Sequence, residues 1–263
     1  MISKIPRKRP RSAVPGPAAY LRRIIHGPLR YVRTMSDIIV LKKEQRAYAK
    51  RVIGSLHSGD LPRKSALIAL RIACSACFKA ADNVFAFSSA DGEPELSALY
   101  AAAARSEKRV FLPVCDEPDD MFFCDVTDAL LGPRAGSVPD ILNMPGEAAR
   151  FDEAVRFTAS HPSRILFTGD GFKTGAYGIP EPDPAVFPAC GPKSGAILLC
   201  PGLAFDKEGH RLGRGKGFFD RFLAGRRALF DSVCGVCFKE LLLPSVAVLP
   251  HDAKMDRVFC DGE

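Results

Sequence analysis

Hydrophobic residues along the chain follow two alternating patterns, one helical and one extended. Apolar residues every three or four positions predict helices over residues 41–56, 65–80, 94–108, 147–160 and 218–225. Short runs rich in Val, Ile, Leu and Phe predict strands over residues 83–89, 109–114, 121–126, 195–206 and 228–238. Strands and helices that alternate in this way are typical of a mostly parallel sheet covered by helices. We therefore predict an α/β fold with three layers and a mostly parallel central sheet.

The length and the Pro and Gly content divide the chain into three parts. Residues 35–263 are long enough for one large α/β domain. The pattern loosens over residues 126–172, which we interpret as an insertion. Residues 1–34 are rich in Pro and Arg and contain no acid, which indicates a disordered extension, a targeting segment or a basic interaction arm. We favour the extension, because "MSDIIVLKKEQR" from Met35 looks like a natural start.

The net charge of +7 comes from this first segment. Nine of the 37 basic residues precede Met35, so the remainder carries 28 basic against 30 acidic residues. A basic patch for nucleic acid is therefore not evident in the body, and we do not expect a nucleic-acid partner. The apolar runs are too short to span a bilayer, so we expect no membrane association.

Nine cysteines and no secretion signal indicate reduced thiols and a cytoplasmic protein. Two pairs have the spacing of zinc ligands, Cys74 with Cys77 and Cys234 with Cys237. The first pair lies in a helical apolar pattern and the second in a predicted strand, where positions three apart point to opposite faces. We therefore favour core cysteines over a zinc site.

The stretch "RLGRGKGFFDR", residues 211–221, places three glycines among cationic side chains. Glycines let backbone amides approach an anion closely, and Arg211, Arg214 and Lys216 add positive charge. We expect the stretch to follow directly on a buried strand, at the sheet edge where α/β proteins bind ligands. Phosphate is the ligand that this arrangement favours. The alternative is a flexible glycine hinge with solvated charges, which would show the same GxGxG spacing.

The longer string "CPGLAFDKEGHRLGRGKGFFDRFL", residues 200–223, resembles the signature of the 5-formyltetrahydrofolate cyclo-ligase family, also called methenyltetrahydrofolate synthetases. Further segments occur in the order of that family: "LKKEQR", "FSSADGEPEL", "RVFLPVCDEPDDMFF", "GIPEP" and "LPHDAKMDRVFC". The resemblance spans nearly everything from Met35 onward. It implies a sheet like that of the superfamily of NagB, RpiA and the coenzyme A transferases.

The resemblance implies ATP- and Mg²⁺-dependent conversion of 5-formyltetrahydrofolate, with or without a polyglutamate tail, to 5,10-methenyltetrahydrofolate, with release of ADP and phosphate. It implies that catalysis depends on Lys42, Arg214 and Lys216. The ATP-binding residues would be Lys42, Arg46, Arg211, Leu212, Gly213, Arg214, Gly215, Lys216, Gly217, Phe218 and Phe219. Ser88, Glu93 and Phe218 would bind the folate, and Asp220 and Asp252 would hold Mg²⁺. We expect a monomer.

The chain departs from the family pattern in two places. Phe218 and Phe219 replace paired tyrosines, which removes two hydroxyl groups and keeps the rings. The segment before "GIPEP" is also longer than usual.

Two other functions compete with the cyclo-ligase reaction. A sugar-phosphate or coenzyme A enzyme is disfavoured by the paired cations Lys42 and Arg46 on one predicted helix. A non-catalytic paralogue that binds nucleotides or nucleic acid would depend on the basic residues 1–34.

Overall fold

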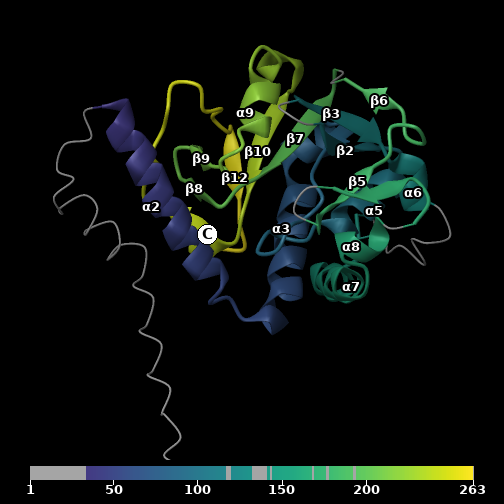
Figure 1. Ribbon diagram of the computed structural model, residues 1–263. Helices are drawn as coiled ribbons and strands as arrows, with labels where there is room; N and C mark the ends of the chain where they lie inside the picture. Colours follow the sequence, from purple (N-terminus) through teal and green to yellow (C-terminus); the bar gives the residue numbers. More distant parts are fainter. Residues whose placement is uncertain are drawn as a thin grey trace, which may run out of the picture.

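A computed structural model describes residues 34–116, 120–131, 141–142, 144–167, 169–175, 178–191 and 194–262. Its largest sheet has seven strands in the order β12-β10-β7-β1-β2-β3-β6 (Figure 1). These strands are β1 (Asn83–Phe85), β2 (Arg109–Asp116), β3 (Asp120–Asp125), β6 (Ala189–Cys190), β7 (Ala196–Pro201), β10 (Ser232–Val236) and β12 (Arg257–Phe259). The strands from β12 to β2 are parallel, whereas β3 and β6 pair antiparallel at one edge. The predicted mixed α/β fold with a mostly parallel central sheet is thereby confirmed.

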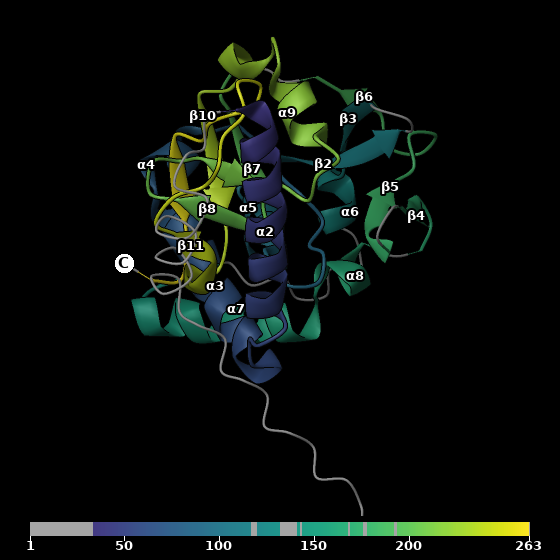
Figure 2. The same cartoon turned by 60° about the vertical axis from the view of Figure 1, so that its left-hand side comes forward.

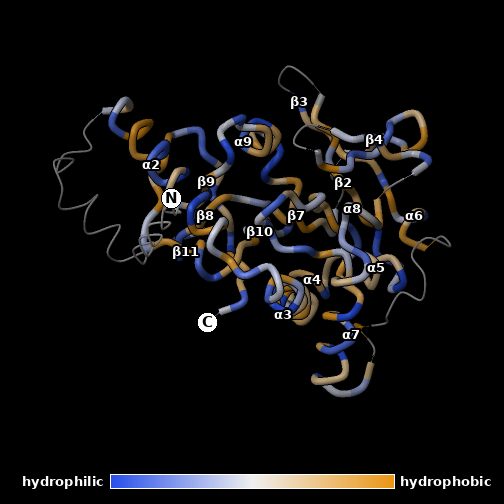
Figure 3. Tube along the Cα trace, turned by 60° about the horizontal axis from the view of Figure 1, so that its bottom comes forward, coloured by the Kyte–Doolittle hydropathy of each residue, from blue (hydrophilic) through white to orange (hydrophobic). Residues whose placement is uncertain are grey.

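The described helices are α2 (Met35–Ile53), α3 (Leu61–Cys74), α4 (Ala76–Ala80), α5 (Ser97–Arg105), α6 (Thr127–Leu131), α7 (Glu147–Ser160), α8 (Ser163–Leu166) and α9 (Phe218–Leu223). Short 3₁₀ turns cover Ser58–Asp60, Arg227–Leu229 and Lys239–Leu241. Figure 3 shows α3, α4 and α5 on one side of the central sheet and α9 on the other. No helix among the described residues has both the length and the apolar character to cross a membrane.

Aromatic side chains fill the centre of the sheet. The Phe85 ring on β1 stacks on the Phe111 ring of β2, with centroids 4.4 Å apart. Phe123 and Phe230 meet the Phe85 ring edge-on, at centroid distances of 5.1 and 5.3 Å. Every residue of β1 and β10 is buried, which explains why these strands are continuous apolar runs rather than alternating ones.

Two smaller sheets carry the residues around the glycine stretch. One contains β11 (Leu242–Leu243), β8 (Ala204–Asp206) and β9 (Arg211–Leu212), and α2 lies beside it (Figure 2). The other is the hairpin of β4 (Phe172–Thr174) and β5 (Pro180–Pro182). Neither was predicted, because strands of two or three residues are too short to show a period.

The predicted strand 195–206 is wrong in one respect, because it divides at Gly202 into β7 and β8. A Cβ at Gly202 would lie 2.8 Å from the Phe205 ring, so the turn needs glycine. The hairpin of β8 and β9 therefore lies between the central strand β7 and the glycines at 213–217, which do not follow β7 directly.

The predicted helix 65–80 is also wrong as a single element. It breaks at Ser75, whose extended backbone (ψ 148°) ends α3, and the Ser75 hydroxyl accepts a hydrogen bond from the Phe78 amide at 3.3 Å. Cys74 is exposed at this break, contrary to the predicted burial, whereas Cys234 and Cys237 are buried as predicted.

The predicted extension (1–34) and the predicted insertion (126–172) fall partly outside the described residues. Residues 1–33 lie outside them, and Thr34 forms the N-cap of α2 with a capping box to Asp37. Within the predicted insertion 126–172 the structure describes α6, α7 and α8, and α7 has the predicted bounds and packs against α3.

Candidate active site

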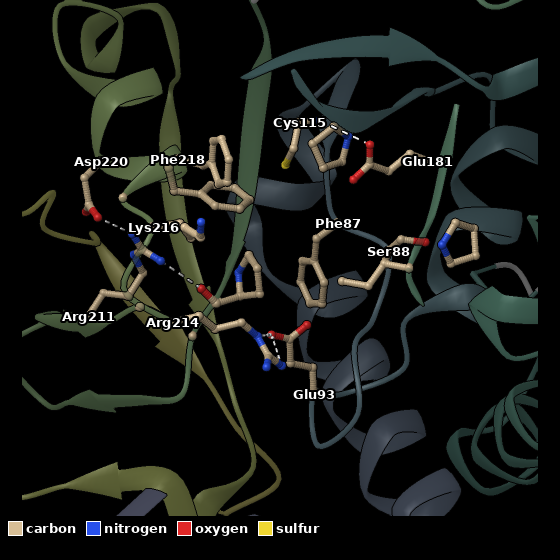
Figure 4. A pocket seen from close by; sticks show the side chains of 18 residues that line it. Phe87, Ser88, Glu93, Cys115, Glu181, Arg211, Arg214, Lys216, Phe218 and Asp220 are labelled. Atoms are coloured by element: carbon tan, nitrogen blue, oxygen red, sulfur yellow. Dashed lines mark hydrogen bonds and ion pairs between the residues drawn. The ribbon is translucent and has the colours of Figure 1, made fainter. Parts of the chain in front are cut away.

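Two neighbouring cavities share the glycine loop, residues 213–217, which joins β9 to α9. Gly213, Lys216, Gly217 and Asp220 line both of them. We call the first the apolar cavity (Figure 4); its other walls are formed by Phe87, Ser88, Glu93, Pro113, Cys115, Ile179, Pro180, Glu181, Pro201, Gly202, Arg211, Arg214, Phe218 and Phe219. We call the second the basic cavity; its other walls are formed by Lys42, Arg46, Gly215, Arg221, Ala224, Leu249, His251 and Asp252.

The loop itself depends on glycine at two positions. Gly215 and Gly217 have φ angles of 112° and 73°, in the left-handed region that other residues rarely adopt. The Arg46 side chain fixes the loop from outside, because its Nε donates to the Gly213 carbonyl oxygen at 3.0 Å. The glycine stretch is therefore a shaped loop held by a helix, not a free glycine hinge.

Helix α2 brings its two cations to the basic cavity. Lys42, Gln45 and Arg46 lie at positions i, i+3 and i+4, on the side of α2 that faces the protein. The Gln45 side-chain amide holds this face of α2 against the backbone of Ser245 and Ala247. It donates to the Ser245 carbonyl and accepts from the Ala247 amide, both at 3.0 Å. Lys42 is 4% exposed and forms an ion pair with Asp252. Asp252 Oδ2 also accepts from the Leu249 amide at 2.6 Å.

Arg211 and Asp220 form a second buried ion pair. Arg211 Nη2 lies 2.8 Å from Asp220 Oδ2, and its Nη1 donates to the Pro201 carbonyl at 3.2 Å. Asp220 Oδ1 accepts from the Ala253 amide at 3.2 Å. The pair thus ties the end of β7 to α9 and to the segment after Asp252. Arg211 Nε is buried without a hydrogen-bond partner among the described residues.

A third ion pair joins the predicted folate segment to the glycine loop. Glu93 Oε1 lies 3.0 Å from Arg214 Nε and 2.9 Å from its Nη2. Glu93 Oε2 accepts from the Ala90 amide at 3.0 Å, so both of its oxygens are engaged. The position of Arg214 at the cavity wall is therefore coupled to the turn that carries Glu93.

The remaining predicted site residues differ in their exposure and in their contacts. Lys216 is exposed on the loop between the two cavities. Ser88 is buried at the wall of the apolar cavity, and its Oγ has no hydrogen-bond partner among the described residues. The Leu212 side chain is fully buried in the core, and Leu212 lines neither cavity, contrary to the expected contact with ATP. The Phe218 ring packs under Arg221 and the Phe219 ring under Arg211, with guanidinium-to-centroid distances of 5.2 and 5.5 Å.

The predicted magnesium ligands line the same cavity, but each is already paired with a cation. In the described part of the chain, no three His, Cys, Asp or Glu side chains gather as a metal site would require on its own. Mg²⁺ in nucleotide sites usually takes one or two carboxylates together with substrate phosphates. Asp220 and Asp252 fit that donor set, with Arg211 and Lys42 as their competing partners.

The β4–β5 hairpin brings residues to the site that sequence reasoning did not select. Ile179, Pro180 and Glu181 line the apolar cavity together with Cys115 of β2. Their segment, "GIPEP", was part of the resemblance, but no role was attached to it. Burial raises the pKa of the Glu181 carboxyl above its ordinary value, while a hydrogen bond from the Cys115 amide opposes the shift.

Residues 39–261 match the 5-formyltetrahydrofolate cyclo-ligase family, and the chain belongs to this family. A probable 5-formyltetrahydrofolate cyclo-ligase of Caenorhabditis elegans is 23% identical over 237 residues, which cover 87% of this chain and 97% of that protein. The 5-formyltetrahydrofolate cyclo-ligase of Mus musculus is 40% identical over 66 residues, 24% of this chain and 32% of that protein.

Solved structures share the fold. The 5,10-methenyltetrahydrofolate synthetase of Aquifex aeolicus superposes with a TM-score of 0.60 at 21% identity, over 85% of this chain and 91% of that one. The 5,10-methenyltetrahydrofolate synthetase from Mycoplasma pneumoniae superposes with a TM-score of 0.55 at 13% identity, over 84% of this chain and 99% of that one.

Proposed function

We propose that the chain closes 5-formyltetrahydrofolate to 5,10-methenyltetrahydrofolate at the expense of ATP, releasing ADP and phosphate. The observation that carries the proposal is the pair of unlike cavities that meet at Lys216. One has the flat apolar walls that suit a pterin ring, and the other has the cations that suit a triphosphate. A phosphoryl group passing between them would cross the loop of residues 213–217.

The reaction needs positioning and charge more than a nucleophilic side chain. The formyl oxygen attacks the γ-phosphorus and ADP leaves. The neighbouring amine then attacks the activated formyl carbon and loses its proton to the departing phosphate, which leaves with the formyl oxygen. Lys42 and Arg46 would bind the nucleotide phosphates from α2, and Lys216 would neutralise charge on the transferred phosphoryl group. Arg214 would hold Glu93 against the loop. When bound, Mg²⁺ would be held by Asp220 and Asp252 and would neutralise part of the phosphate charge.

The family resemblance supports three further features of the proposal: the Mg²⁺ dependence, a substrate with or without a polyglutamate tail, and the superfamily of the fold. The cysteine content supports a cytoplasmic location, and the alternation of strands and helices supports three layers. A monomer stays an expectation. The division into an extension (1–34), a domain (35–263) and an insertion (126–172) also stays a prediction.

The test is to mix purified protein with 5-formyltetrahydrofolate and magnesium-ATP, and to follow the absorbance of the methenyl product. Chains 1–263 and 35–263 should be equally active, because both cavities lie after residue 34. A non-catalytic paralogue that binds nucleic acid would give no product, and its salt-sensitive binding would vanish in the shorter chain.

We expect Asp220→Asn and Asp252→Asn each to raise the Mg²⁺ concentration needed for half-maximal activity. An amide keeps the shape of the carboxylate but loses the charge that holds a hard cation. The measurement is activity against Mg²⁺ at fixed ATP, with Asp231→Asn, an exposed residue outside both cavities, as control. If only one variant responds, the other aspartate serves its ion pair alone.

We expect Phe218→Tyr and Phe219→Tyr to change turnover less than about tenfold. Both rings already pack against arginines at the cavity wall, so the aromatic surface is present without a hydroxyl. A hydroxyl that bonded phosphate or the formyl oxygen would be worth about ten- to a hundredfold in rate. A gain above tenfold in either variant would therefore show that the chain lacks a useful donor.

A further inference from the structure

Glu181 occupies a prepared position in the apolar cavity. It lies on β5, on the wall that faces Lys216 and Asp220 across the cavity (Figure 4). Its Oε2 accepts from the Cys115 amide at 3.4 Å. A Cβ at Gly175 would lie 2.2 Å from Glu181 Cδ, so the glycine in the preceding turn leaves the room that the carboxyl group fills.

Glu181 differs from the other carboxylates of the cavity in having no cationic partner among the described residues. Glu93 pairs with Arg214, and Asp220 pairs with Arg211. Lys173 stands opposite Glu181 in the β4–β5 register, but its ammonium pairs with Asp183 at 2.8 Å. The titratable group of β2 beside it is the Cys115 thiol.

The surroundings of Glu181 call for a hydrogen-bond donor from a ligand. Among the residues that line the cavity, Phe87, Pro113, Ile179 and Pro180 offer no side-chain donor, and the Cys115 thiol is only a weak one. Ser88, on the same side of the cavity in Figure 4, carries a buried Oγ without a partner among the described residues. Polar groups with unused hydrogen-bonding capacity in an apolar wall raise the free energy of the folded protein unless a ligand supplies the hydrogen bonds.

Resting on the proposed function, we propose that Glu181 binds the pyrimidine edge of the pterin ring and thereby sets folate specificity. That edge presents two adjacent N–H donors, from the ring N3 and the 2-amino group, which match the two oxygens of one carboxylate. The formyl group is on the other ring of the pterin. A pterin anchored at Glu181 therefore directs its formyl oxygen across the cavity toward Lys216, where the phosphoryl group would arrive.

The carboxylate must be ionised to accept both hydrogen bonds. Because burial raises the Glu181 pKa, the protonated form becomes populated at a higher pH than for an ordinary glutamate. Protonation removes an acceptor, so folate binding should weaken as the pH falls through this raised pKa. Glu93, Asp220, Arg211, Arg214 and Lys216 also face the cavity, but a Glu181 variant leaves all of them in place.

The test compares wild type with Glu181→Gln, and with Glu208→Gln as a control on the exposed β8–β9 turn. The KM for 5-formyltetrahydrofolate should rise ten- to a hundredfold in Glu181→Gln, while the KM for ATP stays within twofold. The weakening of wild-type folate binding at low pH should be absent in this variant. Gly175→Ala, which displaces the carboxyl without removing it, should also raise the folate KM.

Equilibrium binding of 5-formyltetrahydrofolate, measured by calorimetry without ATP, separates this inference from the proposed function. A protein that binds the folate through Glu181 but forms no product would contradict the function and keep the inference. An active wild type whose folate KM, dissociation constant and pH dependence are unchanged in Glu181→Gln would overturn the inference. Equal increases in the KM for folate and the KM for ATP, together with a lower melting temperature, would also overturn the inference, since they indicate a structural role for Glu181.

Discussion

Replacing Lys216 by alanine should lower kcat at least about a hundredfold and leave the melting temperature unchanged. Lys216 is an exposed loop residue that lines both cavities, so its ammonium is placed to neutralise charge where the phosphoryl group is transferred. An exposed lysine contributes little to packing, which is why stability should not change. The measurement is steady-state kinetics with both substrates varied, beside a thermal unfolding scan.

Lys207→Ala is the matched control, because Lys207 is equally exposed but lies outside both cavities. It should leave kcat and both KM values unchanged. A Lys216→Ala enzyme with normal turnover would show that the loop does not stabilise the transferred phosphoryl group. An effect confined to the KM for ATP would place Lys216 in nucleotide binding alone.

Replacing Lys42 by methionine should destabilise the fold by about 3–5 kcal/mol, in addition to weakening ATP binding. Lys42 and Asp252 form a buried ion pair, with side-chain exposures of 5% and 10%. Removing the lysine leaves the aspartate charge buried without its partner, although the Leu249 amide still donates to it. Denaturant unfolding gives the loss of stability, and the KM for ATP gives the loss of binding.

The double variant Lys42→Met with Asp252→Asn separates these two roles. It removes both charges, so most of the lost stability should return. ATP binding should stay weak, because the cation that faces the nucleotide is still missing. A double variant as unstable as Lys42→Met alone would show that the loss arises from the lysine stem and not from the unpaired charge.

The sequence predicted the elements with long, regular patterns. Helix α7 has the predicted bounds, and β7 and β10 lie within predicted apolar runs. The sequence did not predict the two-residue strands β9 and β11, the division of residues 195–206 into β7 and β8, or the break at Ser75, where the pattern is helical on both sides. The Ser75 side chain caps the second helix at that break, and the spacing of hydrophobic residues carries no information about such a cap.

For the site, the sequence selected many of the residues that line the two cavities, but neither how they divide between the cavities nor how they pair. Lys42, Arg46, Asp220 and Asp252 line the basic cavity, whereas Arg211, Arg214, Phe218 and Phe219, also expected to bind ATP, line the apolar one. Their pairing arises from contacts between segments far apart in the chain, such as α2 and the segment at Asp252, 210 residues apart. Glu181 was missed for the same reason, since its place in the cavity depends on a hairpin folding over β2 and not on a local motif.

The stoichiometry of the reaction tests the central claim most directly. Purified protein is mixed with limiting 5-formyltetrahydrofolate and excess magnesium-ATP, and the methenyl product and ADP are measured in the same sample. We predict one ADP for each methenyl group formed, with no product when ATP is omitted. Hydrolysis of ATP without methenyl formation, or binding of both ligands without reaction, would contradict a cyclo-ligase activity in this chain.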